Sequence, residues 1–398
     1  MRIVYCIPSL HNSGGMERVL TQKANYLADK AGYEVIIITS NQKDRNNFYR
    51  LSPNVKRFDL DIDYEKIKES PLYRRIPARI KAKSTHKEKL SRLLFELKPD
   101  ICISMFTHEM TFLPKIKDGS KKILELHFSK NFRKLDALSN GAPLYLRIIN
   151  NILDYIDRKS IKKYDKFVVL SHQDAKDWGK KYKNLAVIPN PVAFLPPPPH
   201  NYAINIQQKK VLAVGRLCRQ KGFDLLIKIW SQLPEELQKE WHLDIIGKGP
   251  EHESMNILIS ELGLENSVTL KGHTENIEKE YESHDIFCFT SRYEGFGLAL
   301  AEAMAYSMAC ISFDCQCGPS DLIEDNYNGF LVKSFDTKKF LFELISLMKG
   351  SDLREKLGIN AYKFISDNLS ESNILTTWIN LFKQMISNKT TQITPNAF

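Results

Sequence analysis

The feature that most constrains the fold of this chain is a regular alternation of short apolar runs with helical segments. The runs are rich in β-branched and aromatic residues, as strands are, and apolar residues recur at helical spacing between them. Strand–helix alternation favours a mostly parallel sheet with helices on both faces, so we predict a doubly wound α/β fold. Strands are expected at 2–7, 33–40, 55–60, 100–106, 121–128, 165–171, 209–217, 241–249, 267–273, 285–291 and 309–315.

A proline-rich break divides this pattern into two halves. Residues 196–199 are four consecutive prolines, which fit a stiff, extended linker because proline fixes φ and cannot donate to a strand ladder. The length of 398 residues also suits two domains. We predict a Rossmann-like domain over 1–192, a linker over 193–208 and a second Rossmann-like domain over 209–365. The two domains should face each other across a cleft, the default position for a ligand.

The end of the chain, 366–398, is predicted to form a helix that packs back toward the first domain. Apolar residues recur along it at helical spacing, and the last residues read as a frayed end. The expected buried stripe consists of Ile374, Trp378, Leu381 and Ile386.

Charge and cysteine content limit the partners and the compartment. The net charge is +10, which fits phosphorylated small molecules, an anionic membrane or nucleic acid. The seven cysteines are scattered without zinc-site spacing, which favours a reducing compartment. The first residues lack a cleavage site, and no run of about 18 apolar residues occurs. We therefore expect a cytoplasmic protein, peripheral at the inner face of the membrane.

Two cations follow the first strand of the second domain, in "AVGRLCRQKGFDLL". Arg216 and Lys221 flank a short loop at a strand-to-helix turn, where a guanidinium fork and an ammonium point charge suit a diphosphate. The alternative is that both are solvated surface cations. Taken alone, the residues leave both interpretations open.

Two glutamates lie in "TSRYEGFGLALAEAM", at the end of another strand. Gly295 and Gly297 allow a close approach of the backbone, and the start of the following helix favours anions. Glu302, inside the helix, is placed to accept hydrogen bonds from a ribose diol, and Glu294, before the helix, to meet the reacting end of the same ligand. The alternative is two solvated glutamates.

The first domain offers weaker candidates. Gly15, in "SLHNSGGMERVL", would present a backbone N–H across the cleft, and His127 ends the strand "KKILELHF". A histidine there can position a hydroxyl or stabilise developing charge, although a lone histidine is more often structural. The alternating aspartates of "FDLDIDYE" fit a polar strand end better than a metal site, so no metal is predicted.

Together these segments resemble the retaining glycosyltransferases of glycosyltransferase family 4, which have the GT-B fold. The resemblance runs almost unbroken over about 210–333, through "GRLCRQKGFDLLI", "WHLDIIGKGPE", "TSRYEGFGLALAEAMA", "ISFDCQCGPSDLI" and "NGFLV". It is looser in the first domain, through "SGGMERV" and "LELHF". One departure is "YSMAC", where the family usually has glycine and proline at 307–309, a helix end expected to cost stability in a left-handed cap.

The resemblance implies a role for each candidate. Arg216 and Lys221 would neutralise the diphosphate of the donor, Glu302 would hold its ribose, and Gly15 would approach its phosphates from the first domain. The sugar would contact Glu294 and His127, the catalytic candidates. The backbone that lines sugar and phosphates would belong to Phe296, Gly297 and Leu298.

The implied reaction is transfer of a hexose or N-acetylhexosamine, with retention, from a nucleoside diphosphate sugar to a hydroxyl of a glycan or lipid-linked glycan. UDP is the expected nucleotide, and no cofactor or metal is expected. The strongly basic segment 66–98 suits an anionic membrane surface or is merely solvated. The rival functions are a GT-B-fold epimerase or hydrolase and a nucleic-acid-binding protein, and aromatic–basic interleaving is lacking for the latter.

Overall fold

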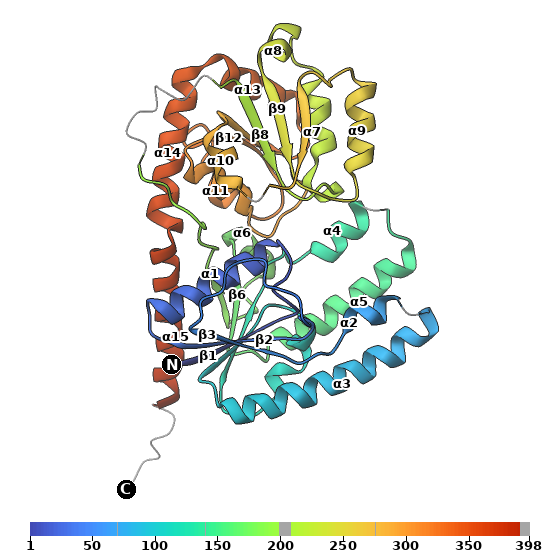
Figure 1. Ribbon diagram of the computed structural model, residues 1–398, viewed down its shortest axis with the longest axis vertical. Coiled ribbons are helices and arrows are strands. Elements are labelled where there is room, and N and C mark those ends of the chain that lie inside the picture. The colour runs from blue at the N-terminus through green and yellow to red at the C-terminus, as the bar shows by residue number, and fades with distance from the viewer. Residues whose placement is uncertain (70, 140, 199–207, 275, 391–398) are drawn as a thin grey trace.

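Two parallel sheets, one from each half of the chain, form the framework of the protein. The computed structural model describes residues 1–69, 71–139, 141–198, 208–274 and 276–390. Figure 1 shows the two sheets one above the other, with the last two long helices running down one side of both. The predicted doubly wound α/β fold is therefore confirmed.

The first sheet has seven strands in the order β3-β2-β1-β4-β5-β6-β7, and every pairing is parallel. The central strands are almost entirely buried, because helices cover the faces of a parallel sheet. The strands are β1 Arg2–Ile7, β2 Glu34–Thr39, β3 Val55–Asp59, β4 Ile101–Ser104, β5 Lys121–Glu125, β6 Lys166–Val169 and β7 Leu185–Val187. The helices of this half are α1 Gly15–Asp29, α2 Tyr64–Glu69, α3 Leu72–Leu97, α4 Phe132–Ser139, α5 Leu144–Ile161 and α6 His172–Trp178, with short 3-10 helices η1 His108–Thr111 and η2 Leu113–Lys115.

The second sheet has six parallel strands in the order β10-β9-β8-β11-β12-β13. They are β8 Lys210–Val214, β9 His242–Ile246, β10 Val268–Gly272, β11 Ile286–Phe289, β12 Ala309–Asp314 and β13 Phe330–Lys333. The helices are η4 Arg219–Lys221, α7 Phe223–Trp230, α8 Glu235–Glu240, α9 His252–Glu261, α10 Ile277–Glu282, α11 Leu298–Ala305, α12 Pro319–Leu322, α13 Thr337–Lys349, α14 Ser351–Leu369 and α15 Glu371–Thr390. Every predicted strand is present, while β7 and β13 were not predicted.

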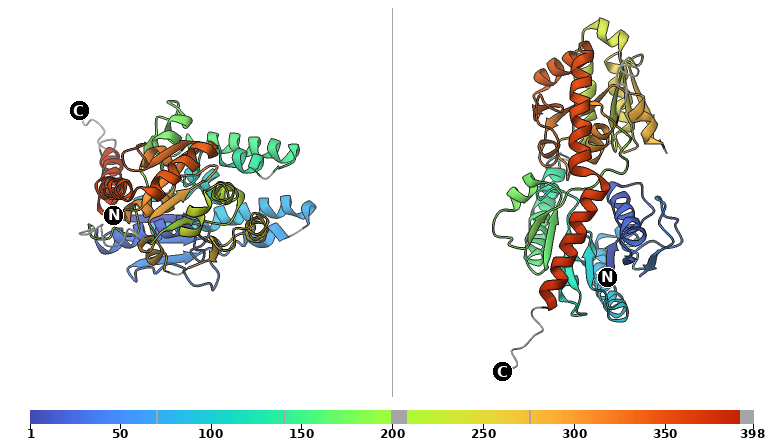
Figure 2. Two further views of the ribbon diagram at one scale, coloured as in Figure 1. Left: turned by 90° about the horizontal axis from the view of Figure 1, so that it is seen from above. Right: turned by 90° about the vertical axis from the view of Figure 1, so that its left-hand side faces the viewer.

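The two C-terminal helices connect the domains. α14 packs on α11 and β12 of the second domain, and α15 continues past the first domain, where it contacts α1. The right-hand view of Figure 2 shows the pair running the length of the molecule. Ile374, Trp378 and Leu381 are buried and Ile386 is partly buried, so the predicted stripe is the packed face of α15.

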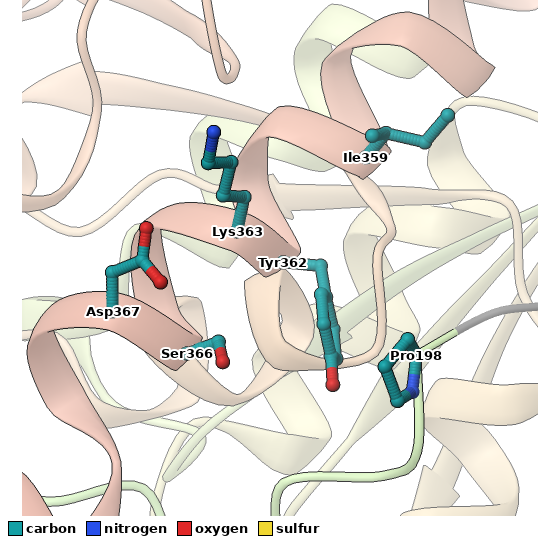
Figure 3. Close-up of a pocket in the computed structure, with 6 residues that line it drawn as sticks. All are labelled: Pro198, Ile359, Tyr362, Lys363, Ser366 and Asp367. Atoms are coloured by element: carbon teal, nitrogen blue, oxygen red, sulfur yellow. The ribbon is translucent and has the colours of Figure 1, made fainter.

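The predicted linker lies only partly within the described residues. Its prolines at 196–198 run beside α14, where the Tyr362 hydroxyl donates to the Pro196 carbonyl at 2.9 Å. A pocket forms there between Pro198 and the α14 side chains, among them Ile359 and Tyr362 (Figure 3). This pocket contains none of the residues predicted to bind a donor.

Ser307 ends the turn after α11 in the left-handed region, with φ of 61°. A non-glycine residue pays for this conformation through the contact of its Cβ with the backbone. We expect Ser307→Gly to raise the free energy of unfolding by about 0.5–1 kcal/mol, measured by thermal unfolding. Ser231→Gly is the control, because Ser231 ends α7 with φ of −64°, and this variant should gain nothing. An equal effect of both variants would contradict the explanation.

Candidate active site

The residues predicted from the sequence lie on two facing edges, one from each domain. Between the sheets, Figure 1 places α1 and α4 of the first domain opposite α11 of the second. The domains meet so closely that a Cβ on Gly295 would lie 2.2 Å from the His127 carbonyl oxygen. A Cβ on Gly15 would lie 3.6 Å from Leu298 Cδ2. Both first-domain candidates therefore adjoin the second-domain segment that starts α11.

Glu294 and Lys221 form an ion pair at the carboxyl edge of the second sheet. Lys221 Nζ, at the end of η4, lies 2.6 Å from Glu294 Oε1, in the loop after β11. The Glu294 side chain is buried, and its backbone N–H donates to the Gln316 carbonyl at 3.0 Å, which fixes the loop. Arg216 is exposed just after β8 and is not part of this pair. The arrangement places an ammonium and a carboxylate side by side, suited to a phosphate and a sugar hydroxyl respectively.

Glu302 is held from both domains. It sits on the fifth residue of α11, is buried, and accepts a hydrogen bond of 3.0 Å from the Tyr281 hydroxyl. Its other oxygen pairs with the guanidinium of Arg18, in the first turns of α1. Neither Arg18 nor Tyr281 was predicted as a site residue. Arg18 brings a further cation to the edge where the phosphates of a donor were expected.

The backbone before α11 has the close approach that its glycines allow. Gly297 is the N-cap of the helix with φ of 91°, in the left-handed region that glycine tolerates best. Phe296 is buried, whereas Leu298, the first helical residue, is partly exposed. The first N–H groups of a helix have no partner within it and carry partial positive charge. The start of α11 can thus receive an anion beside Lys221.

His127 belongs to a buried polar network rather than standing alone. Its Nε2 lies 3.1 Å from Glu125 Oε1, and Lys23 Nζ of α1 lies 2.5 and 2.6 Å from the two Glu125 oxygens. Lys23 also lies 4.3 Å from the ring centroid of Trp378 on α15. The network joins the start of the first domain, the candidate histidine and the C-terminal helix.

The charges of this network follow from its geometry. Burial alone would raise the pKa of Glu125, but the adjacent Lys23 and His127 outweigh burial and lower that pKa to about 2. The carboxylate is therefore ionised at neutral pH, and it orients the imidazole. Lys23 and Glu125 were missed as functional residues because they sit inside elements that read as ordinary helix and strand.

Two other clusters have side chains close enough to share a metal ion, and neither contains a predicted site residue. Protein donors already satisfy their carboxylates: Trp178 Nε1 donates to Asp174 at 3.0 Å, and His284 Nε2 lies 2.9 Å from Asp244. We assign them structural roles. The clusters are Asp174, Asp177 and Cys317, and Asp244, Glu280 and His284.

Both halves of the chain match family models of glycosyltransferases. The model described as "Glycosyltransferase Family 4" matches residues 13–193, and "Glycosyl transferases group 1" matches residues 199–364. An uncharacterized glycosyltransferase of Haemophilus influenzae is 29% identical over 95% of this chain and 98% of its own length. The GalNAc-alpha-(1->4)-GalNAc-alpha-(1->3)-diNAcBac-PP-undecaprenol alpha-1,4-N-acetyl-D-galactosaminyltransferase of Campylobacter jejuni is 27% identical, over 97% of this chain and 99% of its own.

Solved structures agree in fold. Staphylococcus aureus TarM, crystallised with fondaparinux, alpha-GlcNAc-glycerol and UDP, superposes with a TM-score of 0.74 over 96% of this chain and 99% of its own, at 20% identity.

Proposed function

Because this chain belongs to the GT-B glycosyltransferases of the family 4 type, we propose that the cleft between its domains binds a nucleoside diphosphate sugar and transfers the sugar, with retention, to a hydroxyl acceptor. The observation that carries the proposal is the convergence at the start of α11. There the Lys221–Glu294 pair and the Arg18–Glu302 pair flank a helix N-terminus that faces Gly15 and the His127 strand end. Cations for a diphosphate and carboxylates for hydroxyls thus occupy one short stretch of the cleft.

Each group has a task in such a transfer. Breaking the sugar–phosphate bond leaves negative charge on the diphosphate, which Lys221, Arg216, Arg18 and the start of α11 would stabilise. Glu302 would accept hydrogen bonds from the ribose hydroxyls, and Glu294 from the sugar. His127, held by Glu125, would contact the sugar near the reacting carbon. The leaving phosphate would take the acceptor proton on the same face, which retains the configuration. These side chains supply the positive charge, so we expect transfer without an added metal.

The nature of donor and acceptor is part of the proposal. We propose UDP as the nucleotide, in line with the sequence resemblance and with the UDP bound to TarM. The C. jejuni relative has an undecaprenol-linked acceptor in its name, and its alignment spans nearly the whole of both chains. We therefore propose a glycan or lipid-linked glycan as acceptor.

Turnover across a panel of donors tests this function. The protein is incubated with UDP-, GDP- and ADP-sugars and a membrane lipid extract, with and without EDTA. We expect release of UDP and a labelled glycolipid from a UDP-hexose or UDP-N-acetylhexosamine, undiminished by EDTA. Isomerised or hydrolysed sugar without any glycosylated product would favour the epimerase or hydrolase alternative, and no turnover with no nucleotide binding would refute the proposal.

Replacing Glu302 tests the contact with the ribose. We expect Glu302→Ala to weaken UDP binding by about 1.5–3 kcal/mol, roughly tenfold to a hundredfold in Kd, because a charged acceptor of two hydrogen bonds is lost. Calorimetric titration measures the change, with Glu253→Ala on exposed α9 as the matched control. Unchanged UDP affinity in Glu302→Ala would remove the ribose from this position.

A further inference from the structure

Helix α5 is built inside out. Its acidic residues face the protein, where Arg133 pairs with Asp154 at 2.6 Å and with Asp157 at 2.7 Å. Its apolar residues face solvent instead. The exposed members, called here the α5 apolar face, are Tyr145, Ile148, Ile149, Ile152, Tyr155 and Ile156. A surface helix of a globular protein has the opposite arrangement, so this face calls for a cover.

The α5 apolar face belongs to a projecting part of the first domain. Figures 1 and 2 show α5 and α3 extending from the same side of the molecule, away from the sheets. The outer part of α3 likewise exposes Ile76 and Ile80. The exposed apolar surface is thus shared by two neighbouring helices rather than scattered.

Basic residues border the α5 apolar face. Lys159 continues the helical spacing of Ile152 and Tyr155, and Lys162 and Lys163 follow at the end of the helix. All three lysines are exposed. The only acidic residues in α5 are the two that pair with Arg133. The outer surface of α5 is therefore apolar along its length and cationic at its end.

We propose that α5, together with the outer part of α3, docks onto the surface of an anionic lipid bilayer. The apolar face would lie at the boundary of headgroups and acyl chains, with the tyrosines at headgroup depth and the lysines on lipid phosphates. A second copy of the chain fits this surface less well, because a symmetric contact would bring like charges together. The helix would lie on the membrane, since none of the described helices is long and apolar enough to cross one.

Docking through α5 would orient the cleft. α4 leads from the cleft to α5, and Asp136 of α4 accepts a hydrogen bond of 3.2 Å from the hydroxyl of Tyr293, the neighbour of Glu294. A bilayer under α5 would therefore lie beside the mouth of the site, where a lipid-linked acceptor could enter; this last step rests on the proposed function. Sequence reasoning placed the membrane contact on the basic segment 66–98, and the structure adds the apolar component on α5.

Vesicle co-sedimentation tests the proposal without any sugar donor. The full chain is mixed with vesicles of phosphatidylcholine alone or of phosphatidylcholine with phosphatidylglycerol. The test variant is Ile148→Ser/Ile152→Ser, at residues that are 51% and 55% exposed, so that folding is spared. The matched control is Ile257→Ser/Ile359→Ser, at second-domain residues that are 51% and 45% exposed. A third variant, Lys159→Gln/Lys162→Gln, removes charge only.

We expect the wild-type protein and the control to bind the anionic vesicles and to bind neutral vesicles weakly. The isoleucine variant should lose about tenfold or more of its partitioning, and the lysine variant roughly tenfold, only on anionic vesicles. Equal binding by the wild-type and isoleucine proteins, or no binding by the wild type, would overturn the proposal. So would a dimer, seen by sedimentation, that only the isoleucine variant dissociates. Donor hydrolysis by the same variants without vesicles reports separately on the proposed transfer.

Discussion

Replacing Lys221 with methionine is expected to lower kcat for sugar transfer by about 10²–10³-fold, because one fixed charge on the leaving diphosphate is removed. Lys221 lies 2.6 Å from the buried Glu294 carboxylate, at the turn that precedes the amphipathic helix α7. The ammonium should act more strongly on the transition state than on the bound donor, since the charge develops as the bond breaks. Steady-state kinetics with saturating UDP-sugar measure the loss.

The control for this variant is Lys228→Met. Lys228 is an exposed cation on α7 in the same domain, so its loss should change kcat little. Lys221→Arg should retain part of the activity, because the charge is kept while the geometry changes. A Lys221→Met protein that is folded by circular dichroism and as active as Lys228→Met would show that Lys221 does not face the diphosphate.

The second large effect is on stability. Lys23→Met is expected to lower the free energy of unfolding by about 3–5 kcal/mol, because it leaves the Glu125 carboxylate buried without its cation. Lys23 is 1% exposed, and its Nζ donates to both Glu125 oxygens. Urea unfolding measures the loss. The fluorescence of Trp378, 4.3 Å from Lys23 Nζ, reports on the same region.

The double variant Lys23→Met/Glu125→Gln separates loss of the pair from loss of packing. Removing the stranded charge should restore part of the stability. The pH dependence follows from the lowered pKa of Glu125, about 2 when folded. The unfolded chain binds the proton first, so the contribution of this carboxylate is present above its ordinary pKa and is lost as the pH falls toward 2. A Lys23→Met protein as stable as wild type, or a double variant with an unchanged acid profile, would contradict this interpretation.

The strands were predictable because most are buried on both faces. β1, β2, β4 and β12 are runs of consecutive apolar residues, which a parallel sheet requires and a surface helix does not produce. β7 has three residues and β13 has four, and both lie at sheet edges, so they lack such a run. Short edge strands are recognised only through their pairing.

The candidate site was predictable where it is local in sequence. Glu294, Gly297 and Glu302 share one strand–loop–helix segment, whose glycines and carboxylates are visible as a motif. The pairs Arg18–Glu302 and Lys23–Glu125 join distant segments, and only the packing of α1 shows them. The site roles themselves remain predictions for the variants above.

Helix α5 illustrates a further limit of sequence patterns. Its periodicity identifies an apolar stripe, but a stripe is normally taken as the buried side. The direction is set by Arg133, which draws Asp154 and Asp157 inward and leaves the isoleucines outside. Contacts from another element therefore decide which face is presented to solvent.

A crystal structure of the protein with UDP tests the central claim most directly. We predict the diphosphate at the start of α11, beside Lys221 and Arg216, and the ribose hydroxyls within hydrogen-bond distance of the Glu302 carboxylate. UDP bound away from α11, for instance in the pocket beside Tyr362 and Pro198, would contradict the assignment of the donor to this cleft.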